Sequence, residues 1–505
     1  MAAYAPLLQQ MGTGDFAHVK SVGVVGAGVA GLQMCRALVA RGYSVTVFDR
    51  APKVGGLWQK NYDGYGVQVP KQLYEFPDYP LEKVAWGEYA TGAQTQDYIE
   101  SYADSYELRK CLRLNTEVVQ LKKRADGQKG HTFVLAGGDA MDFDFAVIAT
   151  GMYSQKPNLP VWAEGNTSAF KGQVLHSSQY FDPSVCKGKK VIVIGSCKSA
   201  HDCTESAANV ASEPPTMLFR SAHWSTPRLI AGLIPFQYVF LSRLGQALVS
   251  WYKGGFPSGG PCYCTVCCYI LYPIMWVAFK LVTLIFSVQR GHWGEYRPET
   301  DLVSDFFGYA MVLAPDFLYK WRAGKLTGKK GEVAKLVADG VELKSGEKLQ
   351  ADIIICATGF KKTYDYLENK AQLDIQDDGH WLYRHMIPKN VRDLNMAFCG
   401  SEVATITNIM TYAIHAEYIC RMLKNELTLP SVEDMEAEVE RMKAWKRSWM
   451  PETGSRASLV LLYQTHYHDR LLMDMGETPG RKCGPCELLC PYGPHDYDGI
   501  IKSDY

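Results

Sequence analysis

The sequence predicts an α/β fold with two similar domains, the first of them discontinuous, and three observations support it. A glycine-rich turn joins two apolar strands near the N-terminus. A second turn of the same kind follows a later apolar strand. Each turn is followed, further along the chain, by an apolar strand that ends in Ala-Thr-Gly. The chain therefore contains two quasi-repeats, over residues 26–151 and 195–359.

The first turn has the spacing of a Rossmann-like dinucleotide-binding unit. An apolar strand leads into Gly26, Gly28 and Gly31, and the helix that follows is succeeded by a strand that ends in Asp49. Gly26 allows the tight turn, Gly28 lets a pyrophosphate approach the backbone, and Gly31 lets the helix pack against the strand. Asp49 is placed to accept hydrogen bonds from both hydroxyls of a ribose that lacks a 2′-phosphate.

The second turn departs from the first. It contains Gly195, Lys198 and Ser199, which are predicted to contact a second nucleotide. Cys197 and Ala200 stand where the second and third glycines would be. A Cβ atom at position 197 crowds the approach of a phosphate, whereas alanine is common at the helix-packing position.

Arg220 and Ser221 follow the next strand, where Asp49 stands in the first unit. An arginine can bind a 2′-phosphate through two hydrogen bonds, and an acidic residue would repel that phosphate. The first unit is therefore predicted to bind FAD and the second NADP. The alternative for Arg220 is an ordinary surface charge.

Further cofactor contacts are predicted beside these turns. Two adjacent glycines after the first unit let the backbone pass close to a flat ligand, and the small residues of Ala-Thr-Gly permit a chain crossing beside the cofactor. The residues selected from these patterns are Gly55, Gly56, Leu57, Trp58, Thr150, Thr358 and Gly359.

The predicted domains follow from the two repeats. They are a first part of the FAD-binding domain, an NADP-binding domain with a helical insertion, a second part of the FAD-binding domain, and a helical C-terminal extension. Residues 61–107 have no clear period and are interpreted as an irregular insertion over the cofactor, and the end of the chain is expected to be irregular. The domain ranges are 1–165, 186–345 with the insertion at 226–330, 346–430 and 431–505.

Composition excludes some classes of function. In the 505 residues, 53 basic side chains balance 53 acidic ones, so no net field attracts nucleic acid. Residues 1–20 lack the pattern of a signal peptide. A cytoplasmic, reducing location is therefore predicted, in which most of the 15 cysteines are small buried apolar residues.

No metal site is predicted. The Cys-Gly-Pro-Cys at 483–486 has thioredoxin spacing but lacks the expected tryptophan and domain, so inert thiols or a local disulfide are favoured over a redox role. A zinc site would require these thiols to meet the cysteines of 264–267 in space. His466 and His468 would share one face of a strand, without a third ligand.

The stretch 254–289 contains one charged residue, Lys280. Its length suggests a membrane span, but Pro273 interrupts it and leaves two short halves. A buried or surface-lying helical pair is therefore favoured. Peripheral membrane contact through 261–288, on the cytosolic face of an internal membrane, is left open, as is a homodimer.

A specific motif, Phe170-x-Gly172-x-x-x-His176-x-x-x-Tyr180, lies between the two units. Together with the glycine turns and the Ala-Thr-Gly strands, this motif makes the chain resemble the flavin-containing monooxygenases. The motif is the identifying sequence of that family. Members use FAD, NADPH and O₂ to oxygenate nitrogen or sulfur. Four stretches resemble the plant-type branch: Gly-Ser-Cys-Lys-Ser-Ala-His-Asp (195–202), Thr226-Pro227-Arg228, Asp474-Met475-Gly476 and Pro491-Tyr492-Gly493-Pro494.

The resemblance implies an FAD-dependent NADPH monooxygenase of the N,N-dimethylaniline monooxygenase type, acting on a small-molecule amine or sulfide. Many members have Asn-Thr-Ser-Lys in the first insertion, with the Asn contacting flavin and nicotinamide, and Gln68-Val69-Pro70-Lys71 matches it here. Gln68 is therefore the predicted catalytic residue, for a polar contact to the flavin hydroperoxide or to retained NADP⁺. His176 is expected to fix the linker rather than transfer protons.

The expected chemistry needs no nucleophile from the protein. NADPH passes a hydride to FAD, the reduced flavin adds O₂ at C4a to give a hydroperoxide, and the substrate nitrogen or sulfur takes the distal oxygen. In contact with water, the flavin hydroperoxide would lose hydrogen peroxide before it could react with a substrate. The site therefore has to exclude solvent.

Three alternatives stay open. A Baeyer–Villiger ketone monooxygenase is disfavoured by Tyr180, because that class usually has tryptophan there. A disulfide reductase would have a cysteine pair just after Gly55-Gly56, which is absent. A flavoprotein that binds its cofactors without turnover, as a redox-dependent interaction partner, is supported only by Cys197 and Gln68.

Overall fold

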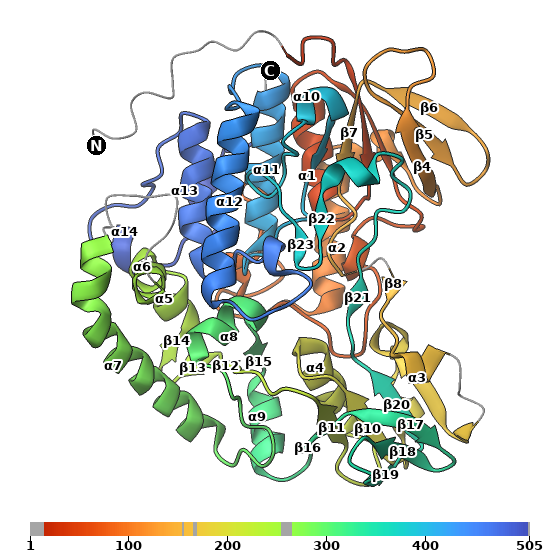
Figure 1. Ribbon diagram of the computed structural model, residues 1–505, viewed down its shortest axis with the longest axis vertical. Coiled ribbons are helices and arrows are strands. Elements are labelled where there is room, and N and C mark those ends of the chain that lie inside the picture. The colour runs from red at the N-terminus through yellow and green to blue at the C-terminus, as the bar shows by residue number, and fades with distance from the viewer. Residues whose placement is uncertain (1–14, 154–155, 165–168, 254–264, 503–505) are drawn as a thin grey trace.

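Two five-stranded parallel sheets form the centre of the molecule, one for each quasi-repeat. The computed structural model describes residues 15–153, 156–164, 169–253 and 265–502. In Figure 1 the first sheet lies in the upper right part of the molecule and the second in the lower right part.

The first sheet has the strand order β24-β7-β1-β2-β3. β1 runs parallel to both neighbours, with Val24 opposite Val47 on one side and Val147 on the other. All three valines are buried, as expected of parallel strands covered on both faces. Because β24 comes from late in the sequence, this domain is discontinuous, as predicted. Its strands are β1 (Ser21–Val25), β2 (Ser44–Phe48), β3 (Leu112–Arg113), β7 (Phe145–Ile148) and β24 (Met396–Phe398).

The second sheet has the strand order β16-β11-β10-β20-β9. β9 and β20 lie outside the range 186–345 predicted for this domain. The predicted range is therefore too short at both ends. The prediction started this domain near its glycine turn and missed the short strand β9, which lies on the N-terminal side of that turn. The strands are β9 (Gln173–His176), β10 (Val191–Ile194), β11 (Thr216–Phe219), β16 (Thr327–Lys330) and β20 (Ile353–Cys356).

Each domain also carries a three-stranded antiparallel sheet. In both units this small sheet directly precedes the strand that ends in Ala-Thr-Gly, so the two quasi-repeats have the same order of elements. The strands are β4 (Val118–Lys123), β5 (His131–Leu135) and β6 (Ala140–Phe143) in the first unit, and β17 (Val333–Val337), β18 (Gly340–Leu343) and β19 (Lys348–Gln350) in the second.

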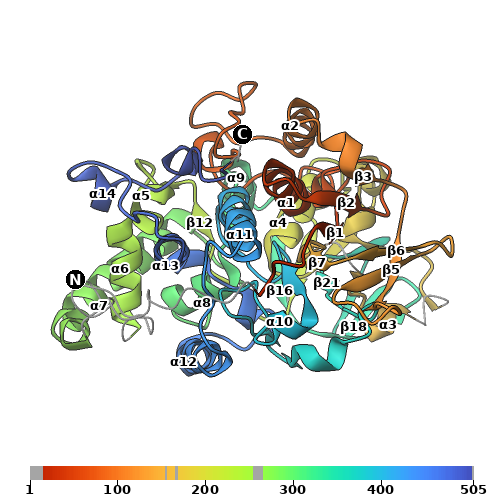
Figure 2. The ribbon, with the colours of Figure 1, turned by 90° about the horizontal axis from the view of Figure 1, so that it is seen from above.

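Helices follow both glycine turns. α1 (Val29–Ala40) follows the first and α4 (Lys198–Ala207) the second. α11 (Asn408–Leu423) lies beside α1 in Figures 1 and 2. The Nε2 of Gln33 donates a hydrogen bond of 2.9 Å to the carbonyl oxygen of Ile409, which joins the two helices.

The helical insertion lies at the lower left in Figure 1, below the C-terminal helices. Arg243 forms ion pairs with Asp469 and Glu487, which attach the insertion to the C-terminal region. The insertion helices are α5 (Phe236–Phe240), α6 (Arg243–Tyr252), α7 (Thr265–Arg290), α8 (Leu302–Tyr309) and α9 (Pro315–Arg322), and the C-terminal helices are α12 (Val432–Trp449), α13 (Gln464–Asp474) and α14 (Cys486–Leu489).

Three local predictions are wrong. The region 61–107 contains a helix, α2 (Gly92–Ser105), which begins with a capping box formed by Thr91 and Gln94. The expected helical pair is one continuous helix, α7, with Pro273 inside it. The end of the chain, expected to be irregular, contains the eleven-residue helix α13. A proline inside a helix costs about 3 kcal/mol and usually ends or kinks it, but α7 runs through Pro273 without a break.

Candidate active site between the two nucleotide-binding domains

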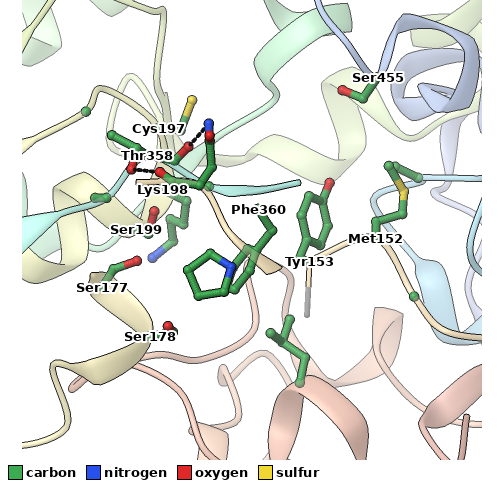
Figure 3. Close-up of a pocket in the computed structure, with 18 of the residues that line it drawn as sticks. Met152, Tyr153, Ser177, Ser178, Cys197, Lys198, Ser199, Thr358, Phe360 and Ser455 are labelled. Carbon is green, nitrogen blue, oxygen red and sulfur yellow. Dashed lines mark hydrogen bonds between the residues drawn. The ribbon is translucent and has the colours of Figure 1, made fainter. Parts of the chain in front are cut away.

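Both glycine turns open onto one cleft of about 2370 Å³. Figure 3 shows part of its lining, with Lys198, Ser199 and Cys197 on one side and Met152 and Ser455 on the other. Of the residues predicted to bind cofactors or substrate, only Gly31 is absent from the cleft wall. Those that line it are Gly26, Gly28, Asp49, Gly55, Gly56, Leu57, Trp58, Gln68, Thr150, Gly195, Lys198, Ser199, Arg220, Ser221, Thr358 and Gly359.

The three glycines of the first turn are needed for different reasons. Gly26 has φ +111°, and a Cβ atom there would lie 2.4 Å from the carbonyl oxygen of Ala149. A Cβ at Gly31 would lie 1.8 Å from the carbonyl oxygen of Gly26, so this glycine allows α1 to pack closely. At Gly28 the nearest protein atom would be 3.7 Å away. Packing within the protein therefore does not require glycine at position 28, and the space on the cleft side is free for a phosphate.

Asp49 is held by the backbone on the cleft wall. Its Oδ2 accepts a hydrogen bond of 2.7 Å from the N–H of Ala27, and its Oδ1 accepts one of 2.8 Å from the N–H of Ala51. A carboxylate has about four acceptor positions, so two remain for a ribose diol. These two bonds fix the orientation of the carboxylate, and the residue fits the role predicted for it.

The second pair of glycines packs against the first turn. The N–H of Gly55 donates to the carbonyl oxygen of Ala27 at 3.0 Å. Gly55 and Gly56 have φ values of +114° and +57°, a region that disfavours other residues. Trp58 continues the wall, with its ring 6.0 Å from the ring of Tyr65. The two glycines leave the backbone uncovered beside the aromatic ring of Trp58, and such a wall suits contact with a planar ring system.

The second turn differs from the first as its sequence indicates. Gly195 has φ +139°, and a Cβ there would lie 2.5 Å from the carbonyl oxygen of Ala357. Cys197 is exposed on the cleft wall, so its side chain occupies space that a second glycine would leave open. Lys198 forms an ion pair with Asp202, which also accepts a hydrogen bond of 3.0 Å from the hydroxyl of Tyr62.

Arg220 and Ser221 are exposed at the edge of the same cleft. Within the described residues, the guanidinium of Arg220 forms no ion pair. It is therefore available for an anionic ligand, and a 2′-phosphate matches its planar pair of donors.

Gln68 connects the FAD-binding side of the cleft to the insertion. Its Oε1 accepts a hydrogen bond of 3.0 Å from the backbone N–H of Val312 in β15 (Val312–Leu313). This bond fixes which end of the amide is the oxygen, so the NH₂ group remains as the donor. An amide donor on the cleft wall is what the predicted role of Gln68 requires.

The sequence did not identify a histidine–aspartate pair in the cleft. His223 Nδ1 lies 2.9 Å from Oδ1 of Asp305, whose side chain is 1% exposed. The hydroxyl of Thr300 also donates to Asp305, at 3.2 Å. Tyr296 donates to the carbonyl oxygen of Ser196, and its hydroxyl accepts from the N–H of His223. His223 is therefore held beside the second turn, with its Nε2 as the ring's remaining polar atom.

The Phe170–Tyr180 motif, on which the family resemblance is based, holds the linker between the two domains in place. His176 is buried, and its Nε2 lies 2.9 Å from the carbonyl oxygen of Gly359 in the second Ala-Thr-Gly. A Cβ at Gly172 would lie 2.2 Å from the carbonyl oxygen of Asp352. The hydroxyl of Tyr180 lies 3.1 Å from the hydroxyl of Ser206. Beside them β8 (Lys156–Pro157) pairs with β21 (Phe360–Lys361). His176 therefore fixes the linker, as expected.

The described part of the chain contains no group of three or more histidine, cysteine or acidic residues that could hold a metal. His466 and His468 lie on the helix α13 and not on a strand, because the end of the chain is helical. The disulfide near the C-terminus joins Cys486 to Cys490, and Cys483 is free. The cysteines at 262 and 264 fall outside the described residues.

Comparison with known proteins identifies the family. A model of the flavin-binding monooxygenase-like family matches residues 19–253 and 323–480. The chain belongs to this family. Its membership confirms the predicted resemblance, the fold with two Rossmann-like domains, and the use of FAD and NADP.

Three similar proteins illustrate the range of the flavin-binding monooxygenases. The chain is 26% identical to the probable flavin-containing monooxygenase 1 of Arabidopsis thaliana, over 94% of this chain and 96% of the relative. The structure of S-allyl-L-cysteine S-oxygenase from Allium sativum matches 91% of this chain and 89% of its own, with a TM-score of 0.59 and 18% identity. That of NADP⁺-bound cyclohexanone monooxygenase from Rhodococcus sp. Phi1 matches 90% and 97%, with a TM-score of 0.66 and 17% identity.

Proposed function

We propose that this flavin-binding monooxygenase uses NADPH and O₂ to oxygenate a nucleophilic nitrogen or sulfur of a small molecule. The observation that carries the proposal is the shared cleft, because both glycine turns open onto it. Two nucleotides bound at these turns would meet in one cleft. A flavoprotein that bound the two nucleotides without turnover would not need to bring them together.

The residues of the chain divide the binding work between the two sides of the cleft. Asp49 and the first turn would hold the ribose and phosphates of FAD, and Trp58 would lie against its ring system. Arg220 and the second turn would hold NADPH. Bound FAD supplies the redox chemistry, by accepting a hydride and activating O₂.

Gln68 would donate a hydrogen bond from its NH₂ group to the reacting end of the cofactors. Its Oε1 is engaged by Val312, so the amide does not need to reorient during a reaction cycle. Aromatic side chains on the cleft wall, Trp58, Tyr65 and Tyr74 among them, would keep water away from that point. No protein nucleophile is required, because the substrate provides the lone pair.

The experiment is a product analysis with the FAD-loaded protein, NADPH and air, on three substrates: a tertiary amine, a thioether and a cyclic ketone. We expect NADPH consumption coupled to an N-oxide or S-oxide. A lactone as the main product would assign the chain to ketone oxygenation instead. NADPH that stays unoxidised with every substrate would overturn the proposal in favour of a flavoprotein without turnover.

A further inference from the structure

Helix α7 is an apolar helix on the outside of the molecule. Figure 1 shows it running along the edge of the insertion, away from both sheets. Its segment Ile270–Arg290 is long and apolar enough to cross a bilayer, yet only 11% of its most apolar 18-residue window is buried. The core helix of a soluble protein would be mostly buried, so the apolar composition of α7 is not explained by packing within the chain.

The exposed aliphatic side chains of α7 lie on one face. They recur at intervals of four and three residues, which places them in a row along a helix. Each is between 56% and 71% exposed, and none is polar. We call this row the apolar stripe: Ile270, Ile274, Val277, Leu281, Leu284 and Val288. At 1.5 Å per residue the stripe is roughly 27 Å long.

The opposite face attaches α7 to the protein along its length. Near the start of the stripe, the ring of Tyr272 stacks on that of Tyr252, at 5.4 Å. Near its end, Phe286 is buried and packs against Phe306 of α8, at 6.0 Å. Because both ends are attached, α7 lies flat on the molecule and cannot cross a bilayer while the domain stays folded.

The edge of the stripe has the composition of a helix at a lipid headgroup layer. Trp276 is 45% exposed, and the ammonium of Lys280 lies 5.6 Å from the centre of its ring. Lys280 forms no ion pair with any described residue, and α7 contains no acidic residue. A tryptophan ring and a lysine that extends toward phosphates are typical of such interfaces.

The apolar surface continues past the C-terminal end of α7. The hairpin of β13 (Leu229–Ile230) and β14 (Ile234–Pro235) carries Leu233, which is 81% exposed. Gln289 holds this hairpin: its Nε2 donates to the carbonyl oxygen of Leu229 at 2.6 Å, and its Oε1 accepts from the N–H of Ala231 at 3.1 Å. The hairpin tip and the stripe are therefore parts of one attached surface.

We propose that α7 and the hairpin tip dock this protein on the surface of an anionic lipid bilayer, with the stripe among the acyl chains and Lys280 at the phosphates. A second copy of the chain fits less well. Stable protein interfaces bury about 800 Å² on each partner and have a polar, hydrogen-bonded rim. The stripe is one side chain wide, and the charged residue exposed beside it on α7 is the basic Lys280.

The test uses the full-length, FAD-loaded protein in a flotation assay. The vesicles contain phosphatidylcholine alone or phosphatidylcholine with phosphatidylserine. We expect the protein to float with the second kind and to do so less at high salt. Leu281→Ser and Leu284→Ser should each weaken binding about tenfold, and Lys280→Glu should weaken binding to the anionic vesicles alone.

The matched control is Val119→Ser, which removes a 45%-exposed valine from β4 and should float as the parent does. Retained FAD absorbance will show that each variant is folded. Protein that stays unbound with both kinds of vesicle would overturn the proposal. So would a dimer in sedimentation that Leu281→Ser dissociates, since that result assigns the stripe to a second copy. Resistance to carbonate extraction would overturn the flat orientation.

Discussion

The side chain of Gln68, from the first domain, accepts a hydrogen bond from the backbone of Val312, 244 residues later in the insertion. Both residues lie on the wall of the cleft onto which the two nucleotide turns open. We expect Gln68→Glu to keep the bond, because a carboxylate also accepts, but to lose the NH₂ donor. Product formation should fall about tenfold or more, with more hydrogen peroxide released per NADPH. Assays of NADPH, peroxide and product on one sample will show this.

Gln68→Asn is the matched control, because it keeps the amide and shortens it by one methylene. It should retain more coupled turnover than Gln68→Glu. Equal coupling in the parent and in Gln68→Glu would contradict a donor role for this residue.

Arg220 should determine the preference for NADPH. A charge-assisted pair with a phosphate contributes about 1.5–3 kcal/mol, so Arg220→Ala should raise the KM for NADPH about tenfold to hundredfold. The KM for NADH should change little, because NADH has no 2′-phosphate. Lys330→Ala, which removes an exposed cation outside the cleft wall, is the control. Steady-state kinetics with both nucleotides would refute the assignment if the two KM values rose together.

The pair of His223 and Asp305 should act as a unit on the NADP side. His223→Ala and Asp305→Asn should each raise the KM for NADPH, because the first removes the imidazole and the second removes the carboxylate that orients it. The double variant should be no worse than the more affected single one. Effects that multiply would mean that the two side chains act separately.

Gly31→Ala should destabilise the first domain. Its Cβ would meet the carbonyl oxygen of Gly26 at 1.8 Å, and overpacking of this kind costs about 1–3 kcal/mol. The matched substitution Gly137→Ala adds a Cβ with nothing within 4 Å and should change stability by less than about 0.5 kcal/mol. Thermal unfolding followed by flavin fluorescence compares the two, and similar midpoints would contradict the packing argument.

Glu477 should make stability depend on pH in acid. Hydrogen bonds from Lys502 and then Arg421 lower the pKa of its carboxyl to about 2 in the folded protein. The unfolded chain holds its proton more tightly, so this stabilisation is present above about pH 5 and is lost as the pH falls toward 2. Glu477→Gln should lower stability by about 1–2 kcal/mol at pH 7 after solvent screening. The difference should shrink at pH 3, and a constant difference in melting temperature would disprove the linkage.

Features that depend on local sequence patterns could be predicted better than features that depend on contacts between distant residues. The roles of Gly26 and Gly31 follow from spacing within one strand–turn–helix unit, and the structure places them accordingly. The pairing of His223 with Asp305 joins residues 82 apart, and no period in the sequence links them. The continuity of α7 through Pro273 was also missed, because a proline is a local signal for the end of a helix.

The short ladder of β8 and β21 limits how the two domains can move. Beside it, Asn158 donates a hydrogen bond of 3.2 Å to the carbonyl oxygen of Thr358. Both passages of the chain between the domains run through this one ribbon. Rotation of the second domain against the first would therefore have to bend both passages at the same point, so the two linkers are coupled and neither can lengthen alone.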